Sequence, residues 1–207
     1  GDTTTMTVAF GHGIAVNAVQ MAGAVASIVN DGQRVHPTLL KANNVNNAMK
    51  SEQIISPRTS ELMRAMMRLV VTHGTAKNAD VAGYLVGGKT GTADKLTGKR
   101  YDENARLSSF IGVFPVNAPR YLVMTVLDNP KGNAKTYGFA TGGWTAAPVV
   151  GRVIGQIGPM LGLQPQEPEL AKVNEDKLLR QLGPEVLESM QINAGEDYAA
   201  NESNSAH

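Results

Sequence analysis

Two apolar segments near the middle of the chain, separated by only three residues, set the strongest limit on the fold. Leu107–Val116 (LSSFIGVFPV) and Arg120–Asp128 (RYLVMTVLD) are rich in β-branched and aromatic residues, which favour strands. The link between them, Asn117–Pro119 (NAP), forms turns and is far too short for a crossover helix. The two segments should therefore pair antiparallel, which excludes a parallel βαβ unit at this point.

A third strand is predicted at Tyr84–Ala93 (YLVGGKTGTA), and its letters allow two functional interpretations. Gly83–Thr90 fits the pattern of a phosphate-binding P-loop, with the Asp that ends the Arg120–Asp128 segment as a Walker B residue. However, a P-loop follows a buried strand and opens a helix, whereas Tyr84-Leu85-Val86 favour strand and glycines interrupt any helix after the Lys-Thr pair. We therefore favour the other interpretation, in which Lys89-Thr90-Gly91 is the triplet of penicillin-interacting serine enzymes.

On a strand, these residues would have distinct chemical roles. Lys89 would be a fixed cation beside a proton-shuttling serine or a substrate carboxylate, and Thr90 would add a hydroxyl donor. The glycines of this segment would leave one strand edge bare, so that another backbone can approach closely. The backbone amide of Thr92 could form half of an oxyanion hole, where one donor contributes about 3 kcal/mol. A Lys-Thr-Gly triplet also occurs by chance on surface strands, so the doubled glycine, Thr92 and the hairpin are what favour a site.

Helices are predicted on both sides of these strands, which gives an α+β class. Ile14–Asn30 is apolar around most of its circumference and predicts a buried helix that stops at Asp31-Gly32. A second helix should start at Ser56-Pro57 and end near Gly74. Its predicted apolar stripe is Leu62, Met66, Leu69 and Val70.

The segments that follow are less regular. Asp94–Arg106 is polar and contains glycine, so we expect a flexible loop between the first two strands. The segment from Gly142 to Leu163 predicts a helix broken by glycines, Pro148 and Pro159. Trp144 could line the rim of a cleft or pack at the start of that helix, and the sequence leaves both open.

Charge divides the chain into a basic body and an acidic C-terminal segment. Residues 1–163 contain 16 Lys/Arg against 9 Asp/Glu, hence +7, and residues 164–207 contain 3 against 9, hence −6. We expect residues 164–207 to form an acidic tail, with a short helix at Glu169–Leu182 and disorder from Asn193 onward. The body could suit a polyanionic wall polymer, but no Lys/Arg cluster indicates nucleic-acid binding.

Nothing in the composition predicts a metal or a cofactor. The chain has no cysteine, and His12, His36, His73 and His207 are too scattered for a metal site. The Asp102-Glu103 pair is expected to be a charged loop rather than a catalytic pair. The chain does not begin with Met, and we expect it to be a piece of a longer protein.

From about Val8 to Leu163, the sequence resembles the C-terminal portion of the transpeptidase domain of class B penicillin-binding proteins, most of all the cell-division (septal) type. The resemblance is carried by FGHGIAVNAVQMAGAVASIVNDGQRVHPTLL, the Gly74-Thr75-Ala76 turn, VGGKTGTA, SSFIGVFP and GGWTAAPVVGRVIG. It implies the penicillin-binding transpeptidase (serine β-lactamase-like) fold, incomplete in this chain. It also implies that Lys89 and Thr90 are catalytic, and that Gly91 and Thr92 bind substrate, Thr92 through its amide.

The resemblance further implies a reaction and its partners. A serine would attack the D-Ala-D-Ala end of a peptidoglycan stem peptide, and β-lactam antibiotics would block that serine. The chain contains neither Ser-x-x-Lys nor Ser-x-Asn, so we expect the nucleophile in an N-terminal part of the same protein and no activity from these residues alone. That part would carry a membrane anchor, placing the domain on the periplasmic face of the inner membrane beside division membrane proteins. A D,D-carboxypeptidase or β-lactamase-like enzyme and a catalytically silent division scaffold remain alternatives.

Overall fold

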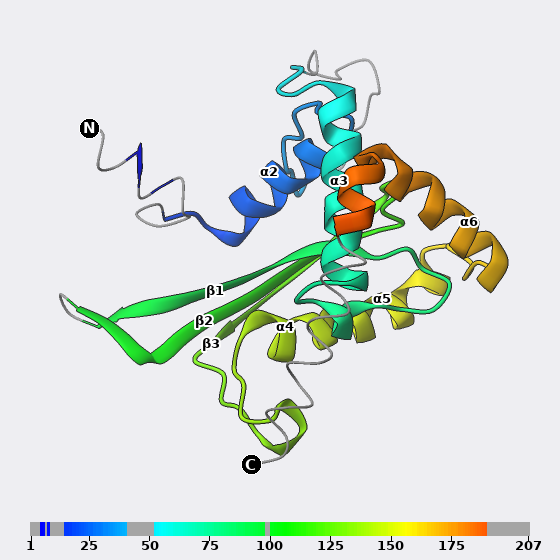
Figure 1. The fold of residues 1–207 in the computed structure, drawn as a ribbon. Coiled ribbons are helices and arrows are strands. Elements are labelled where there is room, and N and C mark those ends of the chain that lie inside the picture. Colours follow the sequence, from blue (N-terminus) through cyan, green and yellow to red (C-terminus); the bar gives the residue numbers. More distant parts are fainter. Residues whose placement is uncertain (1–4, 7, 9–14, 41–51, 98–99, 190–207) are drawn as a thin grey trace.

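The computed structural model describes residues 5–6, 8, 15–40, 52–97 and 100–189. An antiparallel three-stranded sheet lies between two groups of helices, which confirms the predicted α+β class (Figure 1). The strands are β1 (Gly87–Thr97), β2 (Arg100–Phe114) and β3 (Tyr121–Asp128), in the order β1-β2-β3. Within the described residues, β2 is central and β1 is an edge strand.

The P-loop interpretation of Gly83–Thr90 is wrong. Gly87–Thr90 lies in a strand, where Lys89 is opposite Ile111 and Thr90 is opposite Phe110 in an antiparallel ladder. The strand continues past Thr90 to Thr97, so no helix opens after the lysine. Backbone amides that pair along a ladder in this way cannot converge on a phosphate at a helix N-terminus.

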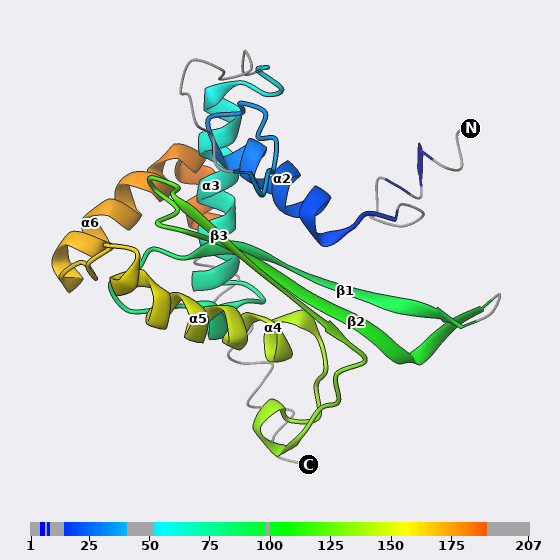
Figure 2. The same ribbon diagram turned by 180° about the vertical axis from the view of Figure 1, so that it is seen from behind.

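The segment predicted as a flexible loop, Asp94–Arg106, instead continues the two strands outward. The ladder pairs Asp94 with Arg106 and then, after a shift in register, Lys95 with Asp102. This part of the hairpin projects away from the helices in both views (Figures 1 and 2). A hairpin that projects away from the helices packs against no apolar layer, so its residues are polar on both faces. The sequence of this segment therefore lacks the alternating apolar pattern from which strands are predicted.

The helices begin where short polar side chains cap them. The first described long helix, α2 (Ala18–Val29), starts later than predicted, because the Asn17 side chain accepts a hydrogen bond from the amide of Gln20 and caps the helix there. It ends at the predicted stop, where Asp31 and Gly32 both have positive φ. α3 (Pro57–Thr72) begins as predicted, with Ser56 as its N-cap.

Helices cover both faces of the sheet (Figures 1 and 2). Alternate residues of β2 point to opposite sides. Phe110 and Phe114 pack against α5 (Ala147–Met160), whereas Val113 packs with Val29 of α2 and Met67 of α3. The short helix α4 (Gly142–Thr145) directly precedes α5, and the two meet at Ala146, so the predicted break near Pro148 is confirmed. The predicted breaks at Pro159 and at the later glycines are wrong, because α5 continues through them to Met160.

The apolar stripe predicted for α3 is right for Val70, which packs against the core, and wrong for Met66. Met66 is exposed, whereas Ala65, Met67, Arg68 and Val71 are buried. α3 contacts α2, β1 and α6, so it buries more than one narrow stripe. The charge of Arg68 is tolerated on the buried face of α3 because the carboxylates of Asp80 and Glu175 neutralise it.

The segment after α5 folds back onto α3. It contains α6 (Pro168–Leu179) and the 3₁₀ turn η4 (Arg180–Leu182). The predicted helix at Glu169–Leu182 is thus present. The disorder predicted from Asn193 onward falls outside the described residues.

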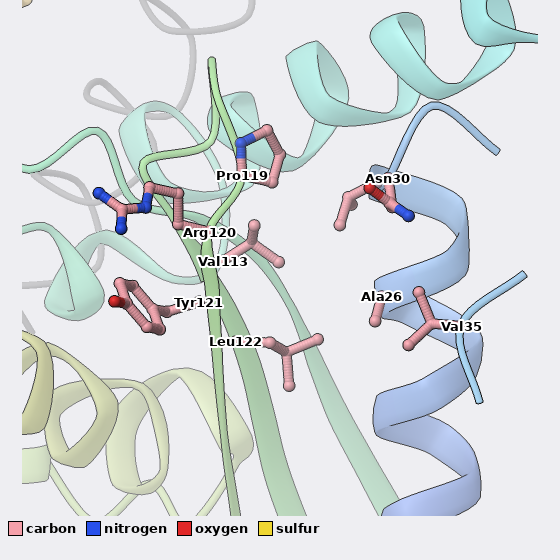
Figure 3. Close-up of a pocket in the computed structure, with 9 residues that line it drawn as sticks. Ala26, Asn30, Val35, Val113, Pro119, Arg120, Tyr121 and Leu122 are labelled. Carbon is pink, nitrogen blue, oxygen red and sulfur yellow. The ribbon is translucent and has the colours of Figure 1, made fainter. Parts of the chain in front are cut away.

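The side of the sheet between α2 and β3 is hollowed. A pocket of about 270 Å³ lies between Ala26 of α2, Asn30 just after that helix and Arg120–Leu122 at the start of β3 (Figure 3). A wider apolar groove continues along α2 and β3, from Val19 and Ala22 to Met124 and Val126. None of the helices in the described ranges is long and apolar enough to cross a membrane.

Candidate active site

The Lys89–Thr92 segment presents its side chains alternately to the two faces of β1. Thr90 and Thr92 face α4, because a Cβ on Gly143 would lie 3.7 Å from Thr90 Cγ2 and the Gly142 amide donates to Thr92 Oγ1. Lys89 and Gly91 therefore belong to the opposite face, the one that α3 covers near Gly87. The strand thus separates the ammonium group from the two hydroxyls.

Lys89 is exposed, and its charge is not neutralised by a carboxylate among the described residues. Its Nζ donates a hydrogen bond of 2.9 Å to the carbonyl oxygen of Thr90, which folds the side chain along the edge of the strand. An ammonium group has three donors. Lys89 can therefore keep this contact and still donate to an anionic or hydroxyl group from outside the sheet.

The two threonine hydroxyls already have partners within the chain. Thr90 Oγ1 lies 2.9 Å from Thr75 Oγ1, and Thr92 Oγ1 accepts a hydrogen bond of 3.1 Å from the Gly142 amide. A hydroxyl both donates and accepts. Thr92 therefore retains its proton for another acceptor, and these contacts fix the rotamers of both threonines.

The explanation offered from sequence for the glycines of β1 is wrong in part. A Cβ on Gly87 would come within 2.5 Å of Val116, and one on Gly88 within 2.4 Å of Phe110. These two glycines make room for packing inside the domain. Close backbone approach does occur further along β1, at Gly91, where a Cβ on Gly142 would lie 2.7 Å from the carbonyl oxygen of Gly91.

Several residues that support the site were missed by sequence reasoning. Thr75 holds the Thr90 hydroxyl, and Asn78 donates a 3.1 Å hydrogen bond to the carbonyl oxygen of Gly143. Ser108, opposite Thr92 in the ladder, is buried and donates to the carbonyl oxygen of Ala140. The Gly74-Thr75-Ala76 turn singles out Thr75 in the sequence. Thr75 and Thr90 are 15 residues apart, however, and no sequence pattern predicts that their hydroxyls meet.

Trp144 packs against an aromatic cluster beside α4. Its ring stacks on Phe139 with centroids 5.7 Å apart, and it meets Tyr137 edge-on at 5.5 Å. The same ring lines a polar pocket with Asn133, Lys135 and Arg152. Packing at the start of the helix is therefore observed, whereas a position on the rim of a cleft beside the Lys89–Thr92 segment stays a prediction.

Other candidates are not brought together. His36 and His73 are exposed and lie on separate segments, while His12 and His207 are outside the described residues. Asp102 and Glu103 lie in β2, in the projecting hairpin, rather than in a loop. In the described ranges, no group of three His, Asp or Glu side chains could hold a metal ion.

The sequence of the chain matches a known protein family over a range that includes this strand. The sequence model of the penicillin-binding protein transpeptidase domain matches residues 2–154. This chain belongs to the penicillin-binding protein transpeptidase family. The matched range contains the Lys89–Thr92 segment together with α2 through most of α5.

Two curated relatives in this family illustrate the similarity. The chain is 38% identical over 170 residues to the probable peptidoglycan D,D-transpeptidase FtsI of Caulobacter vibrioides, covering 78% of this chain and 29% of that protein. It is 36% identical over 181 residues to the stage V sporulation protein D of Bacillus subtilis, covering 83% and 27%. The chain therefore spans less than a third of the length of these relatives.

Solved structures confirm the fold. The apo transpeptidase domain of Burkholderia pseudomallei penicillin-binding protein 3 matches with a TM-score of 0.69 and 35% identity, over 78% of this chain and 47% of that chain. Penicillin-binding protein 3 of Mycobacterium tuberculosis in complex with ampicillin matches with a TM-score of 0.63 and 28% identity, over 76% and 38%. The penicillin-binding transpeptidase fold is therefore present in part. The roles of Lys89, Thr90, Gly91 and Thr92 remain predictions.

Proposed function

We propose that this chain supplies the lysine-bearing strand of a serine D,D-transpeptidase that cross-links peptidoglycan stem peptides. One observation carries the proposal. The Lys89–Thr92 segment is an antiparallel edge strand that exposes an ammonium group while neighbouring residues fix the two threonines. The names of the relatives support the same reaction class.

The reaction would proceed through an ester on a serine outside this chain. The serine oxygen attacks the carbonyl carbon of the penultimate D-Ala, and its proton passes through a base to the departing amine of the terminal D-Ala. The peptide bond between the two residues breaks as the ester forms. An amine from a neighbouring stem peptide then attacks the ester carbon, loses a proton and returns it to the serine oxygen.

The residues of β1 would stabilise the charges that arise in these steps. Lys89 would lie beside the serine hydroxyls that carry the proton, where a cation favours transfer from oxygen. The amide of Thr92 would donate to the oxyanion, and a preorganised donor at that position contributes about 3 kcal/mol. Thr90 and Thr92 would offer hydroxyls to the terminal carboxylate of the stem peptide, and Gly91 would keep the strand thin where the substrate backbone lies alongside.

β-Lactams would acylate the same serine, as donor mimics. Two structures similar to this chain are complexes of Mycobacterium tuberculosis penicillin-binding protein 3, one with ampicillin and one with aztreonam. The family match, residues 2–154, includes the strand that carries Lys89. We therefore propose that the intact protein is a β-lactam target.

We propose a role in septal wall synthesis, on the periplasmic face of the inner membrane and in contact with division membrane proteins. The similarity to a probable FtsI transpeptidase supports this role. A fluorescent fusion of the intact protein should concentrate at the division site. Uniform labelling of the cell envelope would contradict the septal part of the proposal and leave the chemistry untouched.

Replacing Lys89 tests the chemistry directly. In the intact protein, Lys89→Ala should slow acylation by a fluorescent penicillin by about 10- to 150-fold, since a hydrogen bond to a charged group is worth roughly 1.5–3 kcal/mol. Lys89 is exposed, so the variant should remain folded. Stopped-flow or gel-based labelling gives the rate, and circular dichroism checks the fold.

The control is Lys172→Ala, which removes an exposed lysine from α6, away from β1. Wild-type acylation rates in both variants would show that Lys89 is not part of the site. A wild-type protein that penicillin does not label at all would favour the silent scaffold. Rapid release of the label by water would favour a carboxypeptidase or β-lactamase.

A further inference from the structure

Arg68 is the only charged side chain among the buried residues of the described part, and its three partners come from three different segments. Nη1 lies 2.8 Å from Asp80 Oδ1 and donates a second 2.8 Å hydrogen bond to the carbonyl oxygen of Val86. Nη2 lies 3.1 Å from Glu175 Oε2 in α6. Because a buried guanidinium is costly unless it is paired, this arrangement depends on both carboxylates.

The carbonyl that Arg68 holds belongs to the residue immediately before β1. Val86 is fully buried and lies three residues before Lys89. The backbone of α3 is also close at this point, since a Cβ on Gly87 would be 3.2 Å from the Arg68 amide nitrogen. Arg68 thus fixes the origin of the strand that carries the Lys89–Thr92 segment, through its side chain and its backbone.

The second carboxylate comes from a segment that the family match does not include. The match ends at residue 154, whereas Glu175 lies in α6. α6 also reaches the start of β1 through Leu178, which is buried against Leu85 and Val116. Two hydrogen bonds hold the segment in place, each 2.9 Å long. The Gln166 amide donates to the carbonyl oxygen of Gly83, and the Arg58 side chain donates through Nη2 to the carbonyl oxygen of Gln181.

Burial alone would lower the pKa of Arg68, but the hydrogen bonds and charges of Asp80 and Glu175 outweigh burial and raise it. The guanidinium therefore stays charged throughout the neutral range. Asp80 is half exposed, with 46% of its side-chain surface accessible, against 23% for Glu175. Glu175 is thus the less solvated of the two partners, and its charge is the less screened.

We propose that Arg68 is a positioning residue for the Lys89–Thr92 segment, and that α6 holds it in place by supplying Glu175. Without the Glu175 charge, Arg68 would turn toward Asp80 and solvent and weaken its bond to Val86. The start of β1 would then open more often, and Lys89 would be correctly placed for a smaller fraction of the time. The effect on acylation rests on the proposed function, but the effect on the strand does not.

The test compares Glu175→Gln with Glu169→Gln in the intact protein. Both variants remove one carboxylate charge from α6 and keep nearly the same shape, but Glu169 is exposed and makes no ion pair in the described part. Hydrogen exchange of those amides at 87–92 that bond to β2 should become about 5- to 10-fold faster in Glu175→Gln, because amides bonded in the ladder exchange through local opening. Penicillin acylation should slow by a similar factor well below the melting temperature, and Glu169→Gln should match wild type in both measurements.

Equal exchange and equal acylation in the two variants would overturn the proposal. A lower melting temperature for Glu175→Gln with unchanged exchange at 87–92 and unchanged acylation would also overturn it, since that is the signature of a purely structural role. If wild type is not labelled by penicillin, the proposed function fails while exchange still decides the role of Arg68. Should Glu175→Gln not fold, Arg68→Lys retains the charge but lacks the planar fork that reaches three acceptors, and it should show the same pair of changes.

Discussion

At the scale of single residues, the candidate site depends on how closely two backbones approach. α4 lies against the sheet at Gly142, and a Cβ there would come within 2.3 Å of the carbonyl oxygen of Ser109 and 2.7 Å of that of Gly91. Both obstacles are backbone atoms, which cannot rotate away as a flexible side chain can. The short contact also brings the Gly142 amide to the hydroxyl of Thr92.

Gly142→Ala should therefore destabilise the intact protein by about 1–3 kcal/mol, the usual cost of overpacking. The loss of free energy would be measured by denaturant unfolding. The matched control is Gly155→Ala in α5, where the nearest atom to a new Cβ is a Val81 methyl at 3.7 Å. That variant should gain about 0.5–1 kcal/mol, because alanine restricts the unfolded chain more than glycine does. A Gly142→Ala protein as stable as wild type would show that the backbones of α4 and β1 are not in close contact at Gly142.

Arg68 shows why part of the site was not predictable from the sequence. In the sequence of α3, Leu62, Met66, Leu69 and Val70 already supply a predicted apolar face, and an arginine outside that face is predicted to be exposed. Its burial depends on Glu175, which is 107 residues away in the sequence. No local sequence pattern indicates a partner so far away, so an isolated arginine on a helix is predicted to be exposed to solvent.

At the scale of elements, the predictable features are those encoded over short distances. The Ser56-Pro57 start of α3, the positive φ at Gly32 and the hairpin of β2 and β3 follow from caps, glycines and a three-residue link. The outer part of the β1–β2 hairpin was missed because Asp94 and Lys95 pair with charged residues across strands, Arg106 and Asp128, rather than with an apolar layer. Such exposed pairs contribute roughly 0.2–1 kcal/mol each and leave no hydrophobic pattern.

Helix α6 provides an element-scale prediction, because it should be a packed part of the domain despite its acidic composition. Leu178 is 6% exposed and packs with Ala65, Leu85 and Val116. Leu178→Ala should cost about 2–5 kcal/mol of stability in the intact protein, the range for removing a buried leucine side chain. Leu170→Ala, on the same helix but 53% exposed, should change stability by less than about 0.5 kcal/mol. Equal small effects from both variants in thermal unfolding would show that α6 is not docked.

At the scale of the whole molecule, the helices leave an apolar groove on the α2 side of the sheet, so that side is covered less completely than the other. The pocket of Figure 3 and the groove beside it lie between α2 and β3, and both are lined largely by apolar side chains. Val19 and Val126 line this groove and are both exposed. The sequence predicted α2 to be buried because it is apolar around most of its circumference. In the described structure that burial is incomplete, which fits a chain that spans 47% of a solved transpeptidase domain.

The 207-residue chain expressed alone should therefore aggregate or form a molten species. An apolar surface of this kind on a soluble monomer is a docking surface or an aggregation site. Dye binding to exposed apolar surface should be strong, and thermal unfolding should be broad, because the apolar groove along α2 and β3 is uncovered in the described structure. Expression of the intact protein should remove the dye signal and restore a sharp transition. A single cooperative transition without dye binding for the lone chain would mean that α2 and β3 are sufficiently covered by the residues present, and that this side needs no further segment.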